Sequence, residues 1–591
     1  MFFQRLGIIF LWISTVTALW PKPKKCELGS STLWLSPDVE LSVLDNSGFP
    51  GFKWVQEAFQ QILSKVQSSE DEWHNESEEA LLQLGFERMK NTLFNEQFVP
   101  RKFYPRGTVF EPEIVNGTST IESVQIEIVS TAKYSGEAHP SPNVGEAYSL
   151  SISEDGSVLI TTTSGAGGLH ALQTFAQLFY AHSQSDSGVY TSYAPVNIVD
   201  EPEFAHRGLN LDISRNWIPP KDVLRVIEAM AVNKMNRLHI HATDAQSWPL
   251  EIPSLPNLAI DGAYDSSQIW STEDLKEVQR HGYLHGIEVY LEIDIPGHTT
   301  SIAKSHPDLI TAENQMPWNI YAEEPPSGQL KLNSSEVRSF MTSVLNDILP
   351  RNAKASPLFH FGGDEVNRNA YTLDNTVKSS SKEVLQPLLQ SFMDHVFKIA
   401  KKHSITPILW EEMLLEWNLT LPDSTIIQTW RSKEALSHVL SKGHRVLFGA
   451  NTHFYLDCGF GAFYDPIDPD NPGENPMVNP PYLDYCTPYK NWRHIYSHQP
   501  LAGIPEEQKH LVLGGEVHLW GEMTDPSTLD GMLWPRAAAA AELLWRGPGN
   551  PVSEDTTRRL AEMRERLVLK GVAAGMVQME WCLRNRGSCV L

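Results

Sequence analysis

The segment Leu358-Phe-His-Phe-Gly-Gly-Asp-Glu365 is a short apolar run that ends at two glycines and leads directly into two carboxylates. From His206 onward, short apolar runs of this kind alternate with helical segments. This alternation is typical of parallel strands that are joined by helices. The predicted strands span residues 207–213, 237–243, 288–293, 358–362, 407–410, 425–429, 445–448 and 510–514.

Eight such strands predict an α/β fold in which residues 201–591 form a (β/α)8 TIM barrel, the catalytic domain. Pro219 and Pro220 suit a helix start, and Ser271 followed by Asp274 suits a helix N-cap. Residues 458–508 form a long insertion, and loops of this length inside a compact domain are usually functional. The predicted helices include residues 220–232, 272–281, 382–403 and 433–442.

Two segments precede the predicted barrel. Residues 106–200 contain three strand-like segments and an apolar helical run, which predicts a small α+β domain. The Gly165-Ala-Gly-Gly turn before that helical run lacks a full phosphate-binding fingerprint, so we predict a structural turn. Residues 19–105 are assigned to a separate N-terminal segment. The dibasic Arg101-Lys102 near its end would allow processing, which would make it a pro-segment that is either removed or stays bound.

The N-terminus and the cysteines indicate export. Residues 1–18 carry Arg5, an apolar run and a small-residue exit, which is typical of a secretory signal peptide. That run is shorter than the roughly 20 residues that span a bilayer. We therefore expect a secreted protein, with the medium, the wall and a lysosome-like compartment all open. Sequons at Asn75, Asn116, Asn333 and Asn418 and predicted disulfides Cys458–Cys486 and Cys582–Cys589 fit this compartment and leave Cys26 unassigned.

Charge excludes two classes of partner. The 591 residues include 47 Lys and Arg against 72 Asp and Glu, which gives a formal net charge of −25. A polyanion is repelled by nucleic acid and by anionic bilayers, so we expect neither a nucleic-acid nor a membrane partner.

Polar and aromatic residues follow the predicted strands, at the end of a barrel where active sites lie. Histidines and carboxylates in this position allow a metallohydrolase as one interpretation. Aromatic side chains at the same strand ends favour a carbohydrate site instead, because flat rings pack against sugar faces. These aromatic residues are Trp410, Trp430, Tyr455 and Trp520.

The adjacent Asp364 and Glu365 cannot face each other across a glycosidic bond from a regular strand, because neighbouring side chains point to opposite faces. After two glycines the chain has left the strand, so both groups can line one mouth with different targets. A nearby anionic Asp would also raise the pKa of the Glu, which suits a general acid.

The segment from His360 to Glu365 resembles the catalytic signature of glycoside hydrolase family 20, the β-N-acetylhexosaminidases, and the secreted fungal members in particular. Further segments match that family in the same order over residues 175–550. They are His206-Arg-Gly208, His241-Ala-Thr-Asp244, Asp294-Ile-Pro-Gly-His298, Trp410-Glu-Glu412, Tyr455-Leu-Asp457 and Gly514 to Glu522.

This resemblance implies retaining, substrate-assisted hydrolysis of terminal N-acetyl-β-D-glucosamine or galactosamine residues. We expect no cofactor and no metal. The acetamido oxygen of the substrate would be the nucleophile. Glu365 would be the general acid and base, Asp364 would orient the acetamide, and Tyr455 would donate to its carbonyl. The other implied roles are acetamide and ring walls for Trp410, Trp430 and Trp520, sugar hydroxyl contacts for Arg207, Asp457 and Glu522, and support of the acid pair by Asp244 and His298.

Several alternatives stay open at this stage. A carbohydrate-binding protein on a silent barrel is the main rival, although a lectin has no need of an acid. The sequence distinguishes neither gluco- from galacto-configured substrates nor chitin oligomers from glycans. The resemblance also implies a homodimer.

Overall fold

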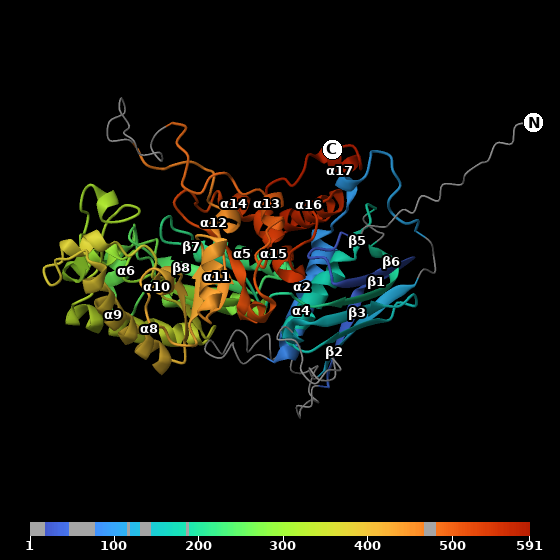
Figure 1. Ribbon diagram of the computed structural model, residues 1–591. Helices are drawn as coiled ribbons and strands as arrows, with labels where there is room; N and C mark the ends of the chain where they lie inside the picture. The colour runs from blue at the N-terminus through green and yellow to red at the C-terminus, as the bar shows by residue number, and fades with distance from the viewer. Residues whose placement is uncertain are drawn as a thin grey trace, which may run out of the picture.

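The computed structural model describes residues 18–46, 77–114, 119–129, 144–184, 188–465 and 480–590. Almost all of the predicted signal peptide, and the sequons at Asn75 and Asn116, lie outside these ranges. Eight parallel strands of the described chain close into a barrel, which confirms the predicted fold class (Figure 1). The barrel strands are β7 (His206–Asp212), β8 (Arg237–Thr243), β9 (Glu288–Ile293), β12 (Leu358–His360), β13 (Thr406–Trp410), β14 (Ile426–Thr429), β15 (Arg445–Phe448) and β16 (Val512–Leu519).

Strand β16 closes the barrel by pairing with β7, and it extends five residues beyond the predicted end at Gly514. The prediction stopped there because glycine pairs usually mark turns. A Cβ at Gly514 would overlap the backbone of His206, and one at Gly515 would overlap Phe448. The glycines therefore allow close strand packing where the barrel closes.

Helices cover the outside of the barrel. Helix α7 begins with the predicted cap, in which the Ser271 and Asp274 side chains bond each other's backbone N–H groups. The longer helices are α5 (Pro220–Val232), α7 (Thr272–Leu284), α8 (Ser335–Ala353), α9 (Lys382–Lys402), α11 (Lys433–Ser441), α15 (Arg536–Arg546) and α16 (Glu554–Leu569). The short elements are α6 (Asn257–Gly262), β10 (Ile310–Thr311), β11 (Gln329–Leu330), α10 (Glu412–Leu415), α12 (Asn451–Phe454), α13 (Trp492–Tyr496), α14 (Leu529–Leu533) and α17 (Glu580–Arg584).

The small domain is a six-stranded sheet with the order β1-β2-β4-β3-β6-β5, and helices α2 and α4 lie between it and the barrel (Figure 1). The predicted boundary at residue 105 is wrong, because β1 pairs with both β2 and β6 of this sheet. The predicted Gly165 turn is the first turn of α4, capped by Ser164. The elements are β1 (Lys25–Asn46), α2 (Glu78–Asn91), β2 (Thr120–Val129), β3 (Tyr148–Ile152), β4 (Val158–Thr162), α4 (Gly165–Gln177), β5 (Tyr180–Ala181) and β6 (Val189–Asp200).

Buried polar contacts join the two domains. The Lys234 ammonium lies 2.9 Å from the Asp200 carboxylate, and both side chains are fully buried. Trp545 donates its indole N–H to the same carboxylate, and Trp20 donates to the carbonyl of Ala538 in α15. Satisfied buried groups of this kind fix the relative position of the domains.

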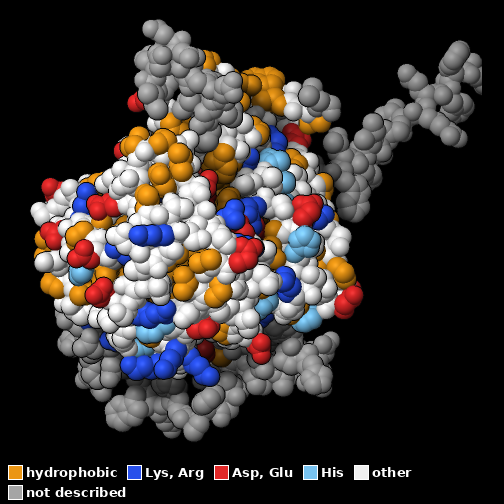
Figure 2. All heavy atoms as spheres, turned by 60° about the vertical axis from the view of Figure 1, so that its left-hand side comes forward, with side chains coloured by type: hydrophobic (Ala, Val, Ile, Leu, Met, Phe, Trp, Pro, Cys, Tyr) orange, Lys and Arg blue, Asp and Glu red, His pale blue; other side chains and the backbone are white. Residues whose placement is uncertain are grey.

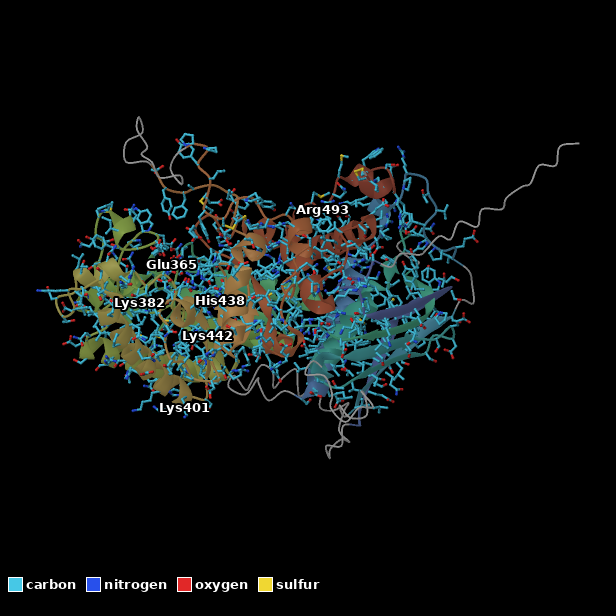
Figure 3. The ribbon with its side chains drawn as sticks, viewed as in Figure 1. Glu365, Lys382, Lys401, His438, Lys442 and Arg493 are labelled. Carbon is cyan, nitrogen blue, oxygen red and sulfur yellow. A yellow bond between two sulfur atoms is a disulfide. The ribbon has the colours of Figure 1, made fainter. Side chains whose placement is uncertain are left out.

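The two ends of the barrel differ in chemistry. Figure 3 places Glu365 toward the upper end of the barrel and Lys401, near the end of α9, at the lower side. Basic residues also gather along one edge of the face in Figure 2. Cations at helix C-termini interact favourably with the helix dipole, which accounts for Lys401 and Lys402 at the end of α9.

Both predicted disulfides are present, Cys458–Cys486 and Cys582–Cys589, and Cys26 takes part in neither. The described sequons Asn333 and Asn418 are exposed. No helix among the described residues is long and apolar enough to cross a bilayer.

Candidate active site

A cavity of about 290 Å³ opens at the carboxyl ends of the barrel strands. Strand ends, the loop before α8 and the 458–508 insertion all contribute to it. Its lining includes Arg215, His298, Asp364, Glu365, Trp430, Tyr455, Asp457, Tyr485, Trp520 and Glu522.

The two glycines after β12 shape the centre of this cavity. Gly362 and Gly363 both adopt positive φ, at 62° and 102°. A Cβ at Gly362 would overlap the Asp294 carboxylate, so a glycine is needed where the chain turns past that group. As predicted, the turn brings both Asp364 and Glu365 to the cavity.

Glu365 belongs to a chain of charged groups. His298 Nε2 lies 3.3 Å from the Glu365 carboxylate, and its Nδ1 lies 3.1 Å from Asp244. Burial opposes the charged form of His298, but the carboxylates of Asp244 and Asp294 outweigh it and raise its pKa well above the usual value. A protonated imidazole therefore lies next to Glu365 and is fixed from behind by Asp244.

Asp364 shares its surroundings with Asp294, whose carboxylate accepts a bond of 2.8 Å from the Gly363 N–H. Burial raises the pKa of Asp364, although His298 works against this shift. Burial and the neighbouring Asp364 raise the pKa of Asp294 well above its usual range. The Oδ1 atom of Asp364 is buried and makes no hydrogen bond to any described residue. This oxygen can therefore accept a hydrogen bond from a donor group of a bound ligand.

Aromatic rings form the inner walls. The Trp430 and Tyr455 rings are nearly parallel with centroids 6.1 Å apart, and Tyr455 meets Trp520 edge-on. Trp430 is held by a bond from its indole N–H to Glu412. These three rings line the cavity as predicted.

Trp410 does not line the cavity, which corrects its predicted role as a wall. It is buried behind Trp520, with ring centroids 6.0 Å apart, and its indole N–H donates to Glu292. The strand prediction placed Trp410 at the correct strand end, but the last residue of β13 still points into the packed interior.

Carboxyl groups surround the far side of the cavity. Burial raises the pKa of Asp457 to about 7 and raises that of Glu522 well above its usual value, with Glu324 adding to the second shift. The Oδ1 atom of Asp457 is buried and makes no hydrogen bond within the described chain. These groups can accept hydrogen bonds from sugar hydroxyls.

Arg207 is far from this cavity, and its predicted contact with sugar hydroxyls is wrong. It lies near the start of β7, at the opposite end of the barrel, where it is fully buried against Glu146. Arg215, just after the end of β7, lines the cavity instead and contacts Asp244 at 2.9 Å and Glu324 at 2.7 Å. The rule that functional groups follow barrel strands would have selected Arg215.

The insertion supplies residues that the sequence did not single out. Phe463, Tyr464 and Tyr485 line the cavity, and the Cys458–Cys486 bridge joins residues adjacent to Asp457 and Tyr485. The abundance of tyrosine in this insertion was the available signal. Glu323 and Glu324, in the loop before α8, carried no such signal because they do not follow a predicted barrel strand.

The site also contains potential metal ligands. Asp294, His298 and Asp364 offer atoms within 4.8 Å of one another, as do Asp244, His298 and Glu324. The Arg215 guanidinium already contacts Asp244 at 2.9 Å and Glu324 at 2.7 Å, so a side-chain cation of the protein accounts for these two carboxylates.

The cavity at the carboxyl ends of the barrel strands brings two carboxyl groups together with aromatic walls, an arrangement typical of carbohydrate-cleaving hydrolases. The profile of the glycosyl hydrolase family 20 catalytic domain matches residues 204–548. The profile described as beta-acetyl hexosaminidase like matches residues 19–178. The chain belongs to glycoside hydrolase family 20 and is a glycoside hydrolase of the β-hexosaminidase type.

Individual relatives agree with this assignment. A beta-hexosaminidase of Arthroderma benhamiae is 44% identical and covers 99% of both chains. A chitooligosaccharidolytic beta-N-acetylglucosaminidase of Ostrinia furnacalis is 33% identical over 79% of this chain and 81% of its own. The fold is similar to that of a family 20 exo beta-N-acetylglucosaminidase from Vibrio harveyi, with a TM-score of 0.69, 21% identity, and 95% and 79% coverage of the two chains.

Proposed function

We propose that this enzyme removes terminal N-acetyl-β-D-glucosamine or galactosamine residues from chitin oligomers or glycans by substrate-assisted, retaining hydrolysis. The observation that carries the proposal is that Asp364 and Glu365 line one cavity together with aromatic rings, while the Oδ1 atom of Asp364 has no hydrogen-bond partner among the described residues. This arrangement suits a bound acetamide rather than a protein nucleophile.

The first step moves a proton from Glu365 to the leaving oxygen while the acetamido oxygen of the substrate attacks the anomeric carbon. An intramolecular nucleophile can reach an effective molarity of roughly 10⁵–10⁸ M, so no protein nucleophile is needed. Water then attacks the anomeric carbon of the resulting oxazolinium ion while Glu365, now a carboxylate, takes its proton, and the bond between that carbon and the acetamido oxygen breaks. His298, fixed by Asp244, orients Glu365 through both steps.

Asp364 accepts the acetamide N–H and stabilises the positive charge that develops on the oxazolinium ring. Tyr455 donates its hydroxyl to the acetamide carbonyl. Trp430 and Trp520 hold the acetamide between flat apolar faces, and Trp410 supports Trp520 from behind. Preorganised groups of this kind stabilise charge without reorganising during the reaction.

Sugar hydroxyls are assigned to the polar side of the cavity. Arg215 and Glu522 are placed to hold O3 and O4, and Asp457 to hold O6. Arg215 takes the role that the sequence gave to Arg207, because only Arg215 lines the cavity.

The decisive experiment compares an aryl N-acetyl-β-glucosaminide with the matching aryl β-glucoside, which lacks the acetamide. We expect cleavage of the first substrate alone. Comparable cleavage of both would mean that the protein supplies its own nucleophile. Binding of both without cleavage would favour the carbohydrate-binding alternative, and loss of activity after chelation would favour a metallohydrolase.

Assembly and location complete the proposal. We infer a secreted homodimer, by the resemblance and by the signal peptide, sequons and disulfides together. Light scattering of the purified protein tests the dimer, and N-terminal sequencing of the exported protein tests cleavage after residue 18.

A further inference from the structure

A second group of ligand-type side chains lies outside the active site, where α5 packs against α7 on the surface of the barrel. Glu228 comes from α5, His281 from the last turn of α7, and His285 from the C-cap of the same helix. The three side chains offer ligand atoms within 4.8 Å of one another. We propose that they form a binding site for one divalent transition-metal ion of the Zn²⁺ type.

The spacing suits chelation. His281 and His285 are four residues apart, so they lie on one helix face, and their ring centroids are 4.3 Å apart. His281 Nε2 lies 3.4 Å from Glu228 Oε1. Ligand bonds of about 2.0–2.2 Å at tetrahedral angles separate ligand atoms by about 3.4 Å. This pair therefore already has the separation that a metal requires.

The histidine tautomers also suit a metal. His285 Nδ1 lies 2.8 Å from the carbonyl oxygen of His281. A carbonyl only accepts, so Nδ1 carries the hydrogen and the Nε2 lone pair is free to ligate. The Nε2 atom of His281 is buried and makes no hydrogen bond of good geometry to any described residue. Each imidazole has one nitrogen within 4.8 Å of the other proposed ligand atoms.

The local charges determine which ions fit. The Arg88 guanidinium of the small domain donates to the Leu284 carbonyl next to His285, so a positive charge lies close to the site. Glu228 is the single carboxylate among the three proposed ligands. Because Arg88 adds positive charge nearby, binding must come from strong imidazole bonds. Zn²⁺, Cu²⁺ and Ni²⁺ form such bonds, whereas Mg²⁺ and Ca²⁺ need several oxygen ligands.

The site is open enough to fill. The Glu228 side chain is 46% exposed, which leaves a path from solvent and room for water as the fourth ligand. A bound ion would link α5 to α7 next to Leu284, whose carbonyl accepts the Arg88 bond from the small domain. We expect the ion to stabilise the fold, because it binds only the native arrangement.

The test uses the full chain after removal of metal with a chelator and dialysis. Zn²⁺ titration by calorimetry should give one site that weakens at least tenfold in Glu228→Gln and in His285→Ala. Zn²⁺ should also raise the Tm of the parent protein but not of these variants. Co²⁺ substitution should give the visible absorption of a tetrahedral site in the parent protein alone.

A matched control is His438→Ala, which removes an exposed histidine on α11 (Figure 3). Its Zn²⁺ affinity should equal that of the parent protein. The proposal is overturned if Glu228→Gln and His285→Ala bind Zn²⁺ as tightly as the control. Hydrolysis of the aryl N-acetylglucosaminide should be unchanged in all three variants, so the outcome is independent of the proposed catalytic mechanism.

Discussion

Arg207 and Arg215 lie eight residues apart, near the start of β7 and just after its end, and they have opposite environments. Arg207 is fully buried, and its guanidinium contacts the Glu146 carboxylate and the carbonyls of Phe204 and Lys234. Arg215 contacts carboxylates too, but it lines a cavity in which Oδ1 of Asp364 and Oδ1 of Asp457 have no hydrogen-bond partner in the described part of the chain. Arg207 has a structural role in the packed interior, whereas Arg215 is part of the candidate active site.

The same contrast holds for the carboxyl groups at the two ends of the barrel. Although burial opposes it, Arg207 holds the pKa of Glu146 well below its usual range. At the mouth, burial and like charges raise the pKa values of Asp364, Asp457 and Glu522. In a barrel of this type, residues at the amino ends of the strands mainly contribute to stability. Residues at the carboxyl ends include carboxyl groups with shifted pKa values that are available for function.

The largest expected effect is a loss of kcat on substitution of Glu365, in the cavity at the carboxyl ends of the barrel strands. Glu365→Gln keeps the shape of the side chain but removes the proton, so kcat should fall about 10³-fold. The Tm should change little, because the Glu365 side chain is partly exposed. An aryl substrate with a very good leaving group should lose less activity, since it needs less protonation. Full turnover by this variant would refute the role of Glu365.

The next largest effect is a loss of stability on substitution of Arg207, at the opposite end of the barrel from the cavity. Arg207→Met removes the cationic partner of Glu146, which keeps its contacts with His170 and Asn236, so we expect a loss of about 1.5–3 kcal/mol of unfolding free energy. Because the folded pKa of Glu146 is depressed, the ion pair stabilises the protein above the unfolded pKa and loses this effect as pH falls. The deficit measured by urea unfolding should therefore shrink at acidic pH.

The folded fraction of Arg207→Met should retain normal kcat and KM, because this arginine does not line the cavity. A large change in kcat/KM at unchanged stability would contradict the division between the two ends. This result would support the original prediction that Arg207 contacts the substrate.

Arg215→Lys tests the other half of the comparison. A lysine keeps the charge but loses the planar fork that contacts Asp244 and Glu324. We expect kcat/KM to fall about 10²-fold, as on loss of one preorganised donor. Thermal unfolding serves as the control and should change less than for Arg207→Met. Equal activity of Arg215→Lys and the parent enzyme would remove Arg215 from the site.

The smallest effect concerns Asp457. Its folded pKa of about 7 is raised above the unfolded value, so ionisation of this group destabilises the native state as pH rises from about 4 to 7. Asp457→Asn should therefore raise the Tm at pH 8 by a few degrees and have little effect at pH 4. Activity should fall at both pH values, because the Asn amide is a weaker acceptor for the sugar hydroxyl than the Asp457 carboxylate. A Tm change independent of pH would contradict the shifted pKa.

Much of this architecture could be predicted from local patterns. Short apolar runs with regular spacing identified all eight barrel strands, and proximity identified both disulfides. The two glycines before Asp364 predicted that both carboxylates leave the strand. The boundary at residue 105 failed because β1 joins a sheet whose other strands follow more than 70 residues later.

The sequence by itself determined the barrel, its chemistry-bearing segments and the family, because strand periodicity, turn glycines and short motifs are local properties of the chain. Only the tertiary structure decided that Arg215 rather than Arg207 reaches the cavity, that Trp410 stands behind its wall, and that the insertion contributes Tyr485. Which side chains share a cavity depends on how distant strands and loops meet when the barrel closes, and pairings of that range leave no local pattern.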